Sequence, residues 1–271
     1  MTQTDPAPDT AQEVLIDARG VVAHYGHRLV LDGIDLEVHS GEIMVIMGVS
    51  GSGKSTLLRL MLGLRQPTRG SIRVMGHEVT RAGTRELYRL REQLGVAFQG
   101  GAMIGSLTIG ENVSLPLTEH TDLDARTIRI IARMKLEMMG LSDVEDMMPA
   151  QLSGGMLKRA GLARAIVGDP KILFFDEPSA GLDPVTAVEL DERILMARRA
   201  MNLTIVVVTH ELESAIKIAD RIAVIQDGRV LETGTVEEIR ASGNEHIQDM
   251  LHRRPRNEAI DTDAYLERLT K

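Results

Sequence analysis

Short apolar runs alternate with longer amphipathic stretches along most of the chain. Runs of apolar residues between turn signals predict strands at Val14–Ala18, Leu29–Val38, Glu42–Met47, Gly95–Phe98, Ile172–Phe175 and Leu203–Thr209. Apolar residues at helical spacing predict helices at Lys54–Leu64, Ala125–Met139, Gly154–Val167 and Ala187–Ala200. Because the strands alternate with helices, the pattern indicates an α/β fold with a parallel sheet.

The pattern also divides the chain into regions. Residues 100 to about 168 hold almost no strand signal, which predicts a helical lobe inserted between two halves of the sheet within a main domain of residues 14–242. Residues 1–13 are rich in Pro, Asp and Thr, which is typical of a disordered lead. From Gly243 to Lys271 we expect a charged helical extension.

Composition excludes several classes of protein. The 271 residues include three Tyr, three Phe and no Trp, which argues against base-stacking nucleic-acid modules. The formal net charge of −8 disfavours binding to nucleic acid. No apolar run reaches the ~18 residues of a membrane-spanning helix, the polar N-terminus lacks a secretory signal, and the absence of Cys excludes disulfides.

One segment matches the phosphate-loop pattern G-x-x-x-x-G-K-[ST] in full, between an apolar strand and an amphipathic helix. In such a loop the glycines turn backbone N–H groups toward phosphate, the lysine reaches the β and γ phosphates, and the serine can bind Mg²⁺. The alternative is a Gly/Ser-rich turn that binds nothing. The residues predicted to bind ATP here are Gly48, Ser50, Gly51, Ser52, Gly53, Lys54, Ser55 and Thr56.

A second candidate site is acidic. Asp176 and Glu177 follow the apolar run Ile172–Phe175, and strand alternation predicts that their side chains point apart. Asp176 suits a place in the Mg²⁺ shell, and Glu177 suits polarising and deprotonating the attacking water. A surface Asp-Glu turn is the alternative.

These motifs, taken in order, resemble those of the ATP-binding cassette ATPases. The sequence Leu152-Ser153-Gly154-Gly155-Met156 is similar to the family's signature, and Gln99 resembles its Mg²⁺-sensing glutamine. The resemblance implies a P-loop NTPase fold with a RecA-like core sheet, an antiparallel β subdomain and an inserted helical subdomain. It also implies ATP as the substrate and Mg²⁺ as the cofactor.

The same resemblance implies roles for three further residues. Asp183 lies in a loop similar to the one through which two cassettes touch, and His210 ends a strand as the family's switch histidine does. Tyr25 precedes Gly48 by 23 residues, where cassettes place a ring on adenine; a buried tyrosine is the competing interpretation. Phe98, Phe174 and Phe175 also stand beside these motifs, so we expect most rings to surround ATP.

The resemblance further implies a head-to-tail homodimer. Each ATP is then bound by one chain's phosphate loop and by the partner chain's signature, of which Ser153, Gly154, Gly155 and Met156 are the matching residues. One set of motifs per chain requires two chains for two composite sites.

Met156 stands where the common cassette signature has Gln, and with Gly100-Gly101-Ala102-Met103 it resembles the ATPase subunits of Mla/Mce-type lipid transporters. That subfamily implies a membrane permease, an Mce-domain lipid-binding protein, a STAS-domain partner and a place on the cytoplasmic face of the bacterial inner membrane. Alternatives are an importer or lipoprotein-release ATPase, and a soluble cassette ATPase acting on DNA or ribosomes.

Two groups of apolar residues each have two interpretations. The methionines of the helical lobe suit either a flexible groove that binds the permease or a core that is poor in aromatic residues. They are Met134, Met138, Met139, Met147, Met148 and Met156. In the tail, an apolar face suits either docking on a partner or a frayed terminus; its members are Ile260, Tyr265, Leu266 and Leu269.

Overall fold

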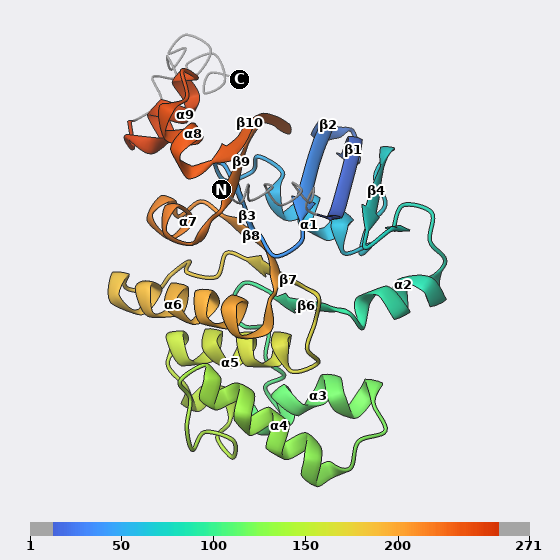
Figure 1. Cartoon of the computed structure of the whole chain (residues 1–271), viewed down its shortest axis with the longest axis vertical. Coiled ribbons are helices and arrows are strands. Elements are labelled where there is room, and N and C mark those ends of the chain that lie inside the picture. The colour runs from blue at the N-terminus through green and yellow to red at the C-terminus, as the bar shows by residue number, and fades with distance from the viewer. Residues whose placement is uncertain (1–12, 255–271) are drawn as a thin grey trace, which may run out of the picture.

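The computed structural model describes residues 13–254, whose strands form two sheets (Figure 1). Most of the expected lead and the apolar face of the tail therefore lie outside the described residues. The strands are β1 (Val14–Tyr25), β2 (Arg28–His39), β3 (Ile43–Met47), β4 (Arg69–Val74), β5 (His77–Glu78), β6 (Leu94–Ala97), β7 (Ile172–Asp176), β8 (Thr204–Thr209), β9 (Arg221–Gln226) and β10 (Arg229–Thr235).

The larger sheet has the order β10-β9-β3-β8-β7-β6, and only β10 pairs antiparallel to its neighbour. Every residue of β3, β7 and β8 is buried. Strands covered on both faces read as continuous apolar runs, which is why the sequence pattern located these three. The predicted α/β fold with a parallel sheet is confirmed.

The smaller sheet is antiparallel, with the order β2-β1-β4-β5, as the resemblance implied. Its first strand was predicted to end at Ala18 but continues to Tyr25. The pairing with β2 shifts register between Ala18 and Val21, and Gly20 there has a φ of 54°. This irregularity interrupts the alternation of polar and apolar residues and hides the second half of the strand.

The helices are α1 (Lys54–Met61), α2 (Thr84–Arg91), α3 (Ile109–His120), α4 (Ala125–Met138), α5 (Gly154–Ile166), α6 (Pro184–Met201), α7 (Leu212–Ile218), α8 (Val236–Ala241) and α9 (Glu245–Leu251). Three of the four predicted helices, α1, α4 and α5, begin at the predicted residue. Helix α6 begins three residues before Ala187, because the Asp183 carboxylate accepts hydrogen bonds from the N–H groups of Val185 and Thr186.

Helices α3, α4 and α5 lie together below the larger sheet (Figure 1). Met139 is fully buried among them, and Met138, Met147 and Met156 pack at the edge of the same core. For these four the core-filling interpretation holds. Met134 differs, since 61% of it is exposed on α4. Within residues 13–254, no helix combines the length and apolar character that crossing a bilayer requires.

The larger sheet separates two hydrophobic clusters, and Phe174 and Phe175 point into opposite ones. Their exposed fractions are 0% and 2%. The expectation that most rings surround ATP is therefore wrong for this pair, because strand alternation sends both rings into the core.

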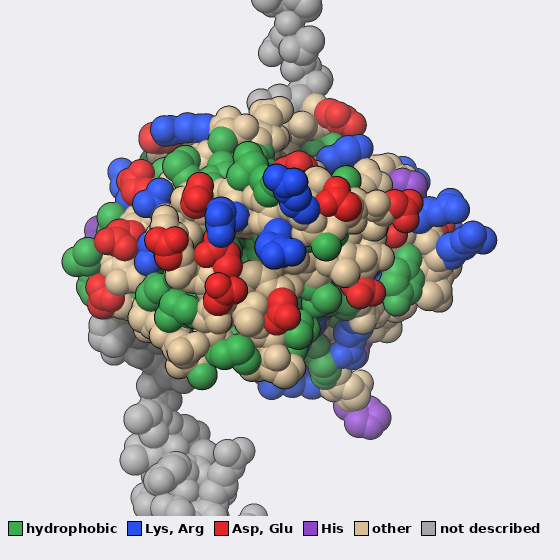
Figure 2. All heavy atoms as spheres, turned by 90° about the horizontal axis from the view of Figure 1, so that it is seen from below, with side chains coloured by type: hydrophobic (Ala, Val, Ile, Leu, Met, Phe, Trp, Pro, Cys, Tyr) green, Lys and Arg blue, Asp and Glu red, His purple; other side chains and the backbone are tan. Residues whose placement is uncertain are grey.

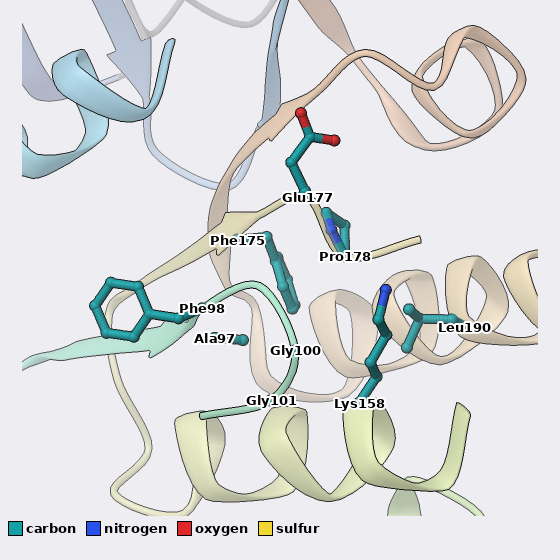
Figure 3. A pocket seen from close by; sticks show the side chains of 9 residues that line it. All are labelled: Ala97, Phe98, Gly100, Gly101, Lys158, Phe175, Glu177, Pro178 and Leu190. Carbon is teal, nitrogen blue, oxygen red and sulfur yellow. The ribbon is translucent and has the colours of Figure 1, made fainter. Parts of the chain in front are cut away.

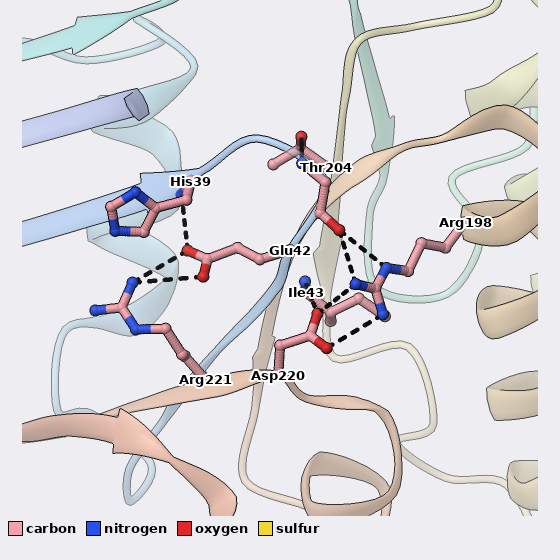
Figure 4. A network of polar contacts seen from close by, with 8 residues as sticks. His39, Glu42, Ile43, Arg198, Thr204, Asp220 and Arg221 are labelled. Carbon is pink, nitrogen blue, oxygen red and sulfur yellow. Dashed lines mark hydrogen bonds and ion pairs between the residues drawn. The ribbon is translucent and has the colours of Figure 1, made fainter. Parts of the chain in front are cut away.

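A polar network fastens the starts of three parallel strands, at the edge opposite the phosphate loop (Figure 4). Arg221 of β9 lies 3.3 Å from the buried Glu42 carboxylate. Arg198 of α6 contacts Asp220 at 2.7 Å and the carbonyl of Gly41 at 2.8 Å. Because β3 is followed directly by the phosphate loop, this network helps to fix the position of the strand on which the loop is built.

Candidate active site

The phosphate loop joins the end of β3 at Met47 to the start of α1 at Lys54. Gly48 is buried, and a Cβ atom there would lie 2.1 Å from the carbonyl oxygen of Ile225. Gly53 has a φ of 106°, and a Cβ atom on it would lie 2.5 Å from Leu31 Cδ2. Both positions therefore require glycine, for space in one case and for space and backbone conformation in the other.

A cavity of about 240 Å³ opens over this loop. Lys54 is only 6% exposed, and its ammonium donates to the carbonyls of Gly48 at 2.8 Å and Val49 at 3.0 Å. Burial lowers the pKa of Lys54, while Glu177 and Asp176 act in the opposite direction. The cavity is lined by Arg28, Val30, Gly51, Gly53, Lys54, Ser55 and Thr56.

Two features of the loop suit an anion. The hydroxyl of Ser52 is buried and has no hydrogen-bond partner among the described residues. Helix α1 has Gly53 at its N-cap, so it has no capping side chain, and its first turn holds no acidic residue. Its N-terminal N–H groups and positive dipole end therefore face the cavity unneutralised, which is the arrangement that binds phosphate.

The phosphate loop meets the acidic strand through Ser55. Its hydroxyl donates to Oδ1 of Asp176 at 3.0 Å, and Asp176 is 8% exposed. A hydroxyl and a carboxylate are oxygen ligands of the kind that Mg²⁺ accepts beside substrate phosphates. Gln99, the third predicted metal residue, is exposed just beyond the end of β6. Ser50 and Gly51 are exposed at the tip of the phosphate loop.

Glu177 and His210 are in direct contact, although 33 residues separate them. Oε1 of Glu177 lies 2.9 Å from Nδ1 of His210, and Oε2 accepts from the Thr209 hydroxyl at 3.2 Å. Since a carboxylate only accepts hydrogen bonds, Nδ1 carries the hydrogen in this contact. Two residues singled out separately in the sequence thus form one acid–histidine pair.

Asp176 and Glu177 contact different partners, Ser55 and His210, but strand alternation is not the reason. β7 ends at Asp176, and Glu177 has a φ of 53°, in the left-handed region that non-glycine residues rarely occupy. Its N–H donates to the carbonyl of Val208 at 2.8 Å, which holds this conformation. A turn, rather than the pleat of a strand, directs the Glu177 carboxylate to His210.

The signature residues start α5. The Ser153 hydroxyl accepts from the N–H of Met156 at 3.3 Å, so Ser153 caps the helix. Gly154 is exposed, whereas a Cβ atom on Gly155 would lie 2.4 Å from Thr186 Cγ2. The signature therefore packs against the first turn of α6, which Asp183 caps.

Tyr25 ends β1 and is 41% exposed, so the buried interpretation of this ring is wrong. The guanidinium of Arg65 lies over the ring, 3.6 Å from its centroid. Arg65 also donates to the carbonyl of His24 at 2.6 Å. One face of the ring is thus covered by a cation.

Three cationic residues beside these motifs were not predicted to have a role: Arg28, Arg65 and Lys158. Arg28 lines the cavity over the phosphate loop from the start of β2. Nothing in the local sequence distinguishes these cations from surface arginines and lysines, because only the tertiary fold brings them to the site.

Comparison with known proteins agrees with this geometry. The sequence model of the ABC transporter family matches residues 31–180 of this chain. The protein MlaF of Haemophilus influenzae, named as an intermembrane phospholipid transport system ATP-binding protein, is 40% identical over 88% of this chain and 90% of its own. The Mycobacterium leprae protein mkl, named as a probable ribonucleotide transport ATP-binding protein, is 36% identical over 89% of this chain and 70% of its own.

A solved structure of an ATP-binding cassette is also similar to this chain. It is a dimeric ATP-binding cassette in a post-hydrolysis state with ADP and Pi, 30% identical, with a TM-score of 0.74 over 82% of this chain and 98% of that chain. This chain therefore belongs to the ABC transporter family.

Proposed function

We propose that this chain is the ATP-hydrolysing subunit of a transporter that moves phospholipid across the bacterial envelope. The observation that carries the proposal is the 40% identity to a phospholipid-transport ATP-binding protein over nearly the full length of both chains. In this proposal residues 14–242 form the cassette, about 100–168 its helical subdomain, and 243–271 an extension.

In the proposed reaction, the phosphate loop binds the ATP phosphates through its N–H groups and Lys54. Ser55, Asp176 and Gln99 would hold Mg²⁺, which would neutralise charge that develops on the phosphates. Glu177 accepts the proton of the attacking water, and His210 orients Glu177 and contacts the γ-phosphate. The contacts that join Ser55 to Asp176 and Glu177 to His210 support these assignments.

The proposed assembly is a homodimer in which Ser153, Gly154, Gly155 and Met156 act on the partner chain's ATP and Asp183 lies near the interface. The solved relative is also a dimer. The exposed N-terminus of α5 at Ser153 and Gly154 leaves donors available to a second chain's nucleotide.

We further propose that a membrane permease docks on the helical end of the molecule, at the cytoplasmic face of the inner membrane. Viewed from that end, both signs of charge are interspersed with apolar side chains (Figure 2). A groove of about 620 Å³ lies there, with apolar walls formed by Leu107, Leu115, Leu123 and Ile128. An Mce-domain protein and a STAS-domain subunit complete the proposed complex.

Isolation of the native complex from membranes tests this proposal. A tagged wild-type chain should retain a permease, an Mce-domain protein and phospholipid, as identified by mass spectrometry. A tagged Lys54→Met chain, which should assemble without binding ATP, is the matched control. A periplasmic solute-binding protein in place of the Mce-domain protein, or ribonucleotide in place of lipid, would overturn the assigned cargo.

A further inference from the structure

Two hydrogen bonds connect α5 to the backbone of Glu177. The ammonium of Lys158, in the second turn of α5, donates to the carbonyl of Ala180. The N–H of Ala180 in turn donates to the carbonyl of Glu177 at 3.4 Å. Lys158 therefore holds the turn that immediately follows Glu177, the residue whose backbone is in the left-handed conformation.

The surroundings of Lys158 are mostly apolar (Figure 3). Its side chain rises from α5 toward Pro178, between Phe175 and Leu190. Burial lowers the pKa of Lys158, while Glu177 and Glu211 act in the opposite direction. Removing an ammonium from water is costly unless it gains a specific partner, and the carbonyl of Ala180 is that partner.

The same helix also holds the segment after Gln99. Arg164 donates to the carbonyls of Gly101 and Ala102, each at 3.0 Å. A Cβ atom on Gly161 would lie 3.1 Å from Gly101 Cα, so the segment packs directly on α5. Helix α5 thus carries the signature at its start, Lys158 near its middle and the Gln99 segment beside its end.

We propose that Lys158 is a positioning residue that ties the signature helix to the turn that directs Glu177. This inference rests on the proposed function, in which Ser153 acts on the partner's ATP and Glu177 on the chain's own. A displacement of α5 when Ser153 engages a γ-phosphate is then transmitted through Ala180 to Glu177. Each composite site thereby senses the occupancy of the other.

The first test compares Lys158→Met with Lys158→Arg in the full-length chain. Methionine keeps the apolar stem but cannot donate, so kcat should fall about 10-fold to 100-fold, as for a misplaced catalytic group, with KM for ATP within 2-fold. Arginine should restore at least half of kcat, because it keeps a cationic donor. The exposed Lys171→Met is the control and should match wild type. Unchanged kcat for the methionine variant, or no rescue by arginine, would overturn the proposal.

The second test is a double-mutant cycle with Ser153→Ala. If Lys158 transmits the engagement of Ser153, the double variant should lose little more activity than the more damaging single variant. Losses that multiply would show that the two residues act independently and would overturn the coupling. If Lys158→Met does not fold, Lys158→Leu, which also cannot donate a hydrogen bond, replaces it. A wild-type chain that does not hydrolyse ATP would instead refute the proposed function itself.

Discussion

Nδ1 of His210 lies 2.9 Å from Oε1 of Glu177, so the residue after β8 is joined directly to the residue after β7. Glu177 is held from three directions, since its Oε2 also accepts from the Thr209 hydroxyl and its N–H donates to Val208. A general base works only if its carboxylate is within reach of the water it deprotonates. The contact with His210 therefore sets the direction of the Glu177 carboxylate, the proposed base.

His210→Ala should remove this orientation. We expect kcat for ATP hydrolysis to fall about 100-fold, within the range that positioned acid–base groups contribute, while the affinity for ATP changes little. Turnover assays and equilibrium binding with a fluorescent ATP analogue measure the two effects. His120→Ala, on the exposed end of α3, is the control. Normal turnover by the His210 variant would exclude its role.

Arg65→Met should weaken nucleotide binding without changing the chemistry. The guanidinium lies 3.6 Å from the Tyr25 ring centroid and fixes one face of the ring. A cation–π contact at an exposed site is worth about 0.5–1 kcal/mol, so KM for ATP should rise about two-fold to five-fold at constant kcat. Arg85→Met on α2 serves as the control. An unchanged KM would mean that Arg65 has no part in presenting Tyr25.

Ser55→Ala should raise the Mg²⁺ concentration needed for half-maximal hydrolysis. The Ser55 hydroxyl lies 3.0 Å from Asp176, and losing it removes one of the two oxygen ligands that these residues offer. Disturbing a metal site typically costs about 10-fold to 100-fold in metal affinity or activity. Titration of ATPase activity with Mg²⁺ measures the shift, with Ser71→Ala of β4 as control. The same half-maximal concentration in both variants would contradict the metal assignment.

A buried pair between α6 and α7 should make stability depend on pH. The Ser214 hydroxyl donates to the carboxylate of Asp191, which is 2% exposed. Burial raises the pKa of Asp191, and Glu192 adds to this, while Ser214 and Lys217 lower it. Because the pKa is higher in the folded chain than in the unfolded chain, protonation in acid contributes stability that is lost as pH rises through the folded pKa.

Ser214→Ala leaves the ionised Asp191 without this donor, which should destabilise the fold by about 1–3 kcal/mol at neutral pH. Urea unfolding at several pH values should show the loss shrinking in acid, where the carboxyl group is protonated. With Asp191→Asn as background, the same serine substitution should cost an amount that does not vary with pH. A pH-independent loss in the wild-type background would refute the explanation.

The sequence predicted the strands of the fold best where every side chain of a strand is buried. β3, β7 and β8 are within one residue of their predicted ends, because every side chain in them is buried. β9 has an equally apolar centre, Ile222–Ile225, which the same criterion could have found. α3 is harder to predict because Pro116 lies inside it, and its start is marked instead by the capping box of Thr108 and Glu111.

The candidate site was predictable only as far as its motifs are continuous in sequence. The loop from Gly48 to Ser55 and the pair Asp176 and Glu177 are such motifs. The left-handed conformation of Glu177 could not be read from the residues, since it depends on a hydrogen bond to Val208 in a neighbouring strand. The contacts of Arg65 and Lys158 likewise exist only after the sheets and helices assemble.

In the proposed mechanism, Glu177 is the base that deprotonates water in an ATP-driven dimer. ATP turnover by Glu177→Gln, measured in the full-length chain, tests it most directly. Glutamine keeps the shape of the side chain but cannot accept the proton, so hydrolysis should fall by about 100-fold or more, while ATP binds and holds two chains in a stable dimer. Turnover within a few-fold of wild type would show that Glu177 is not the base.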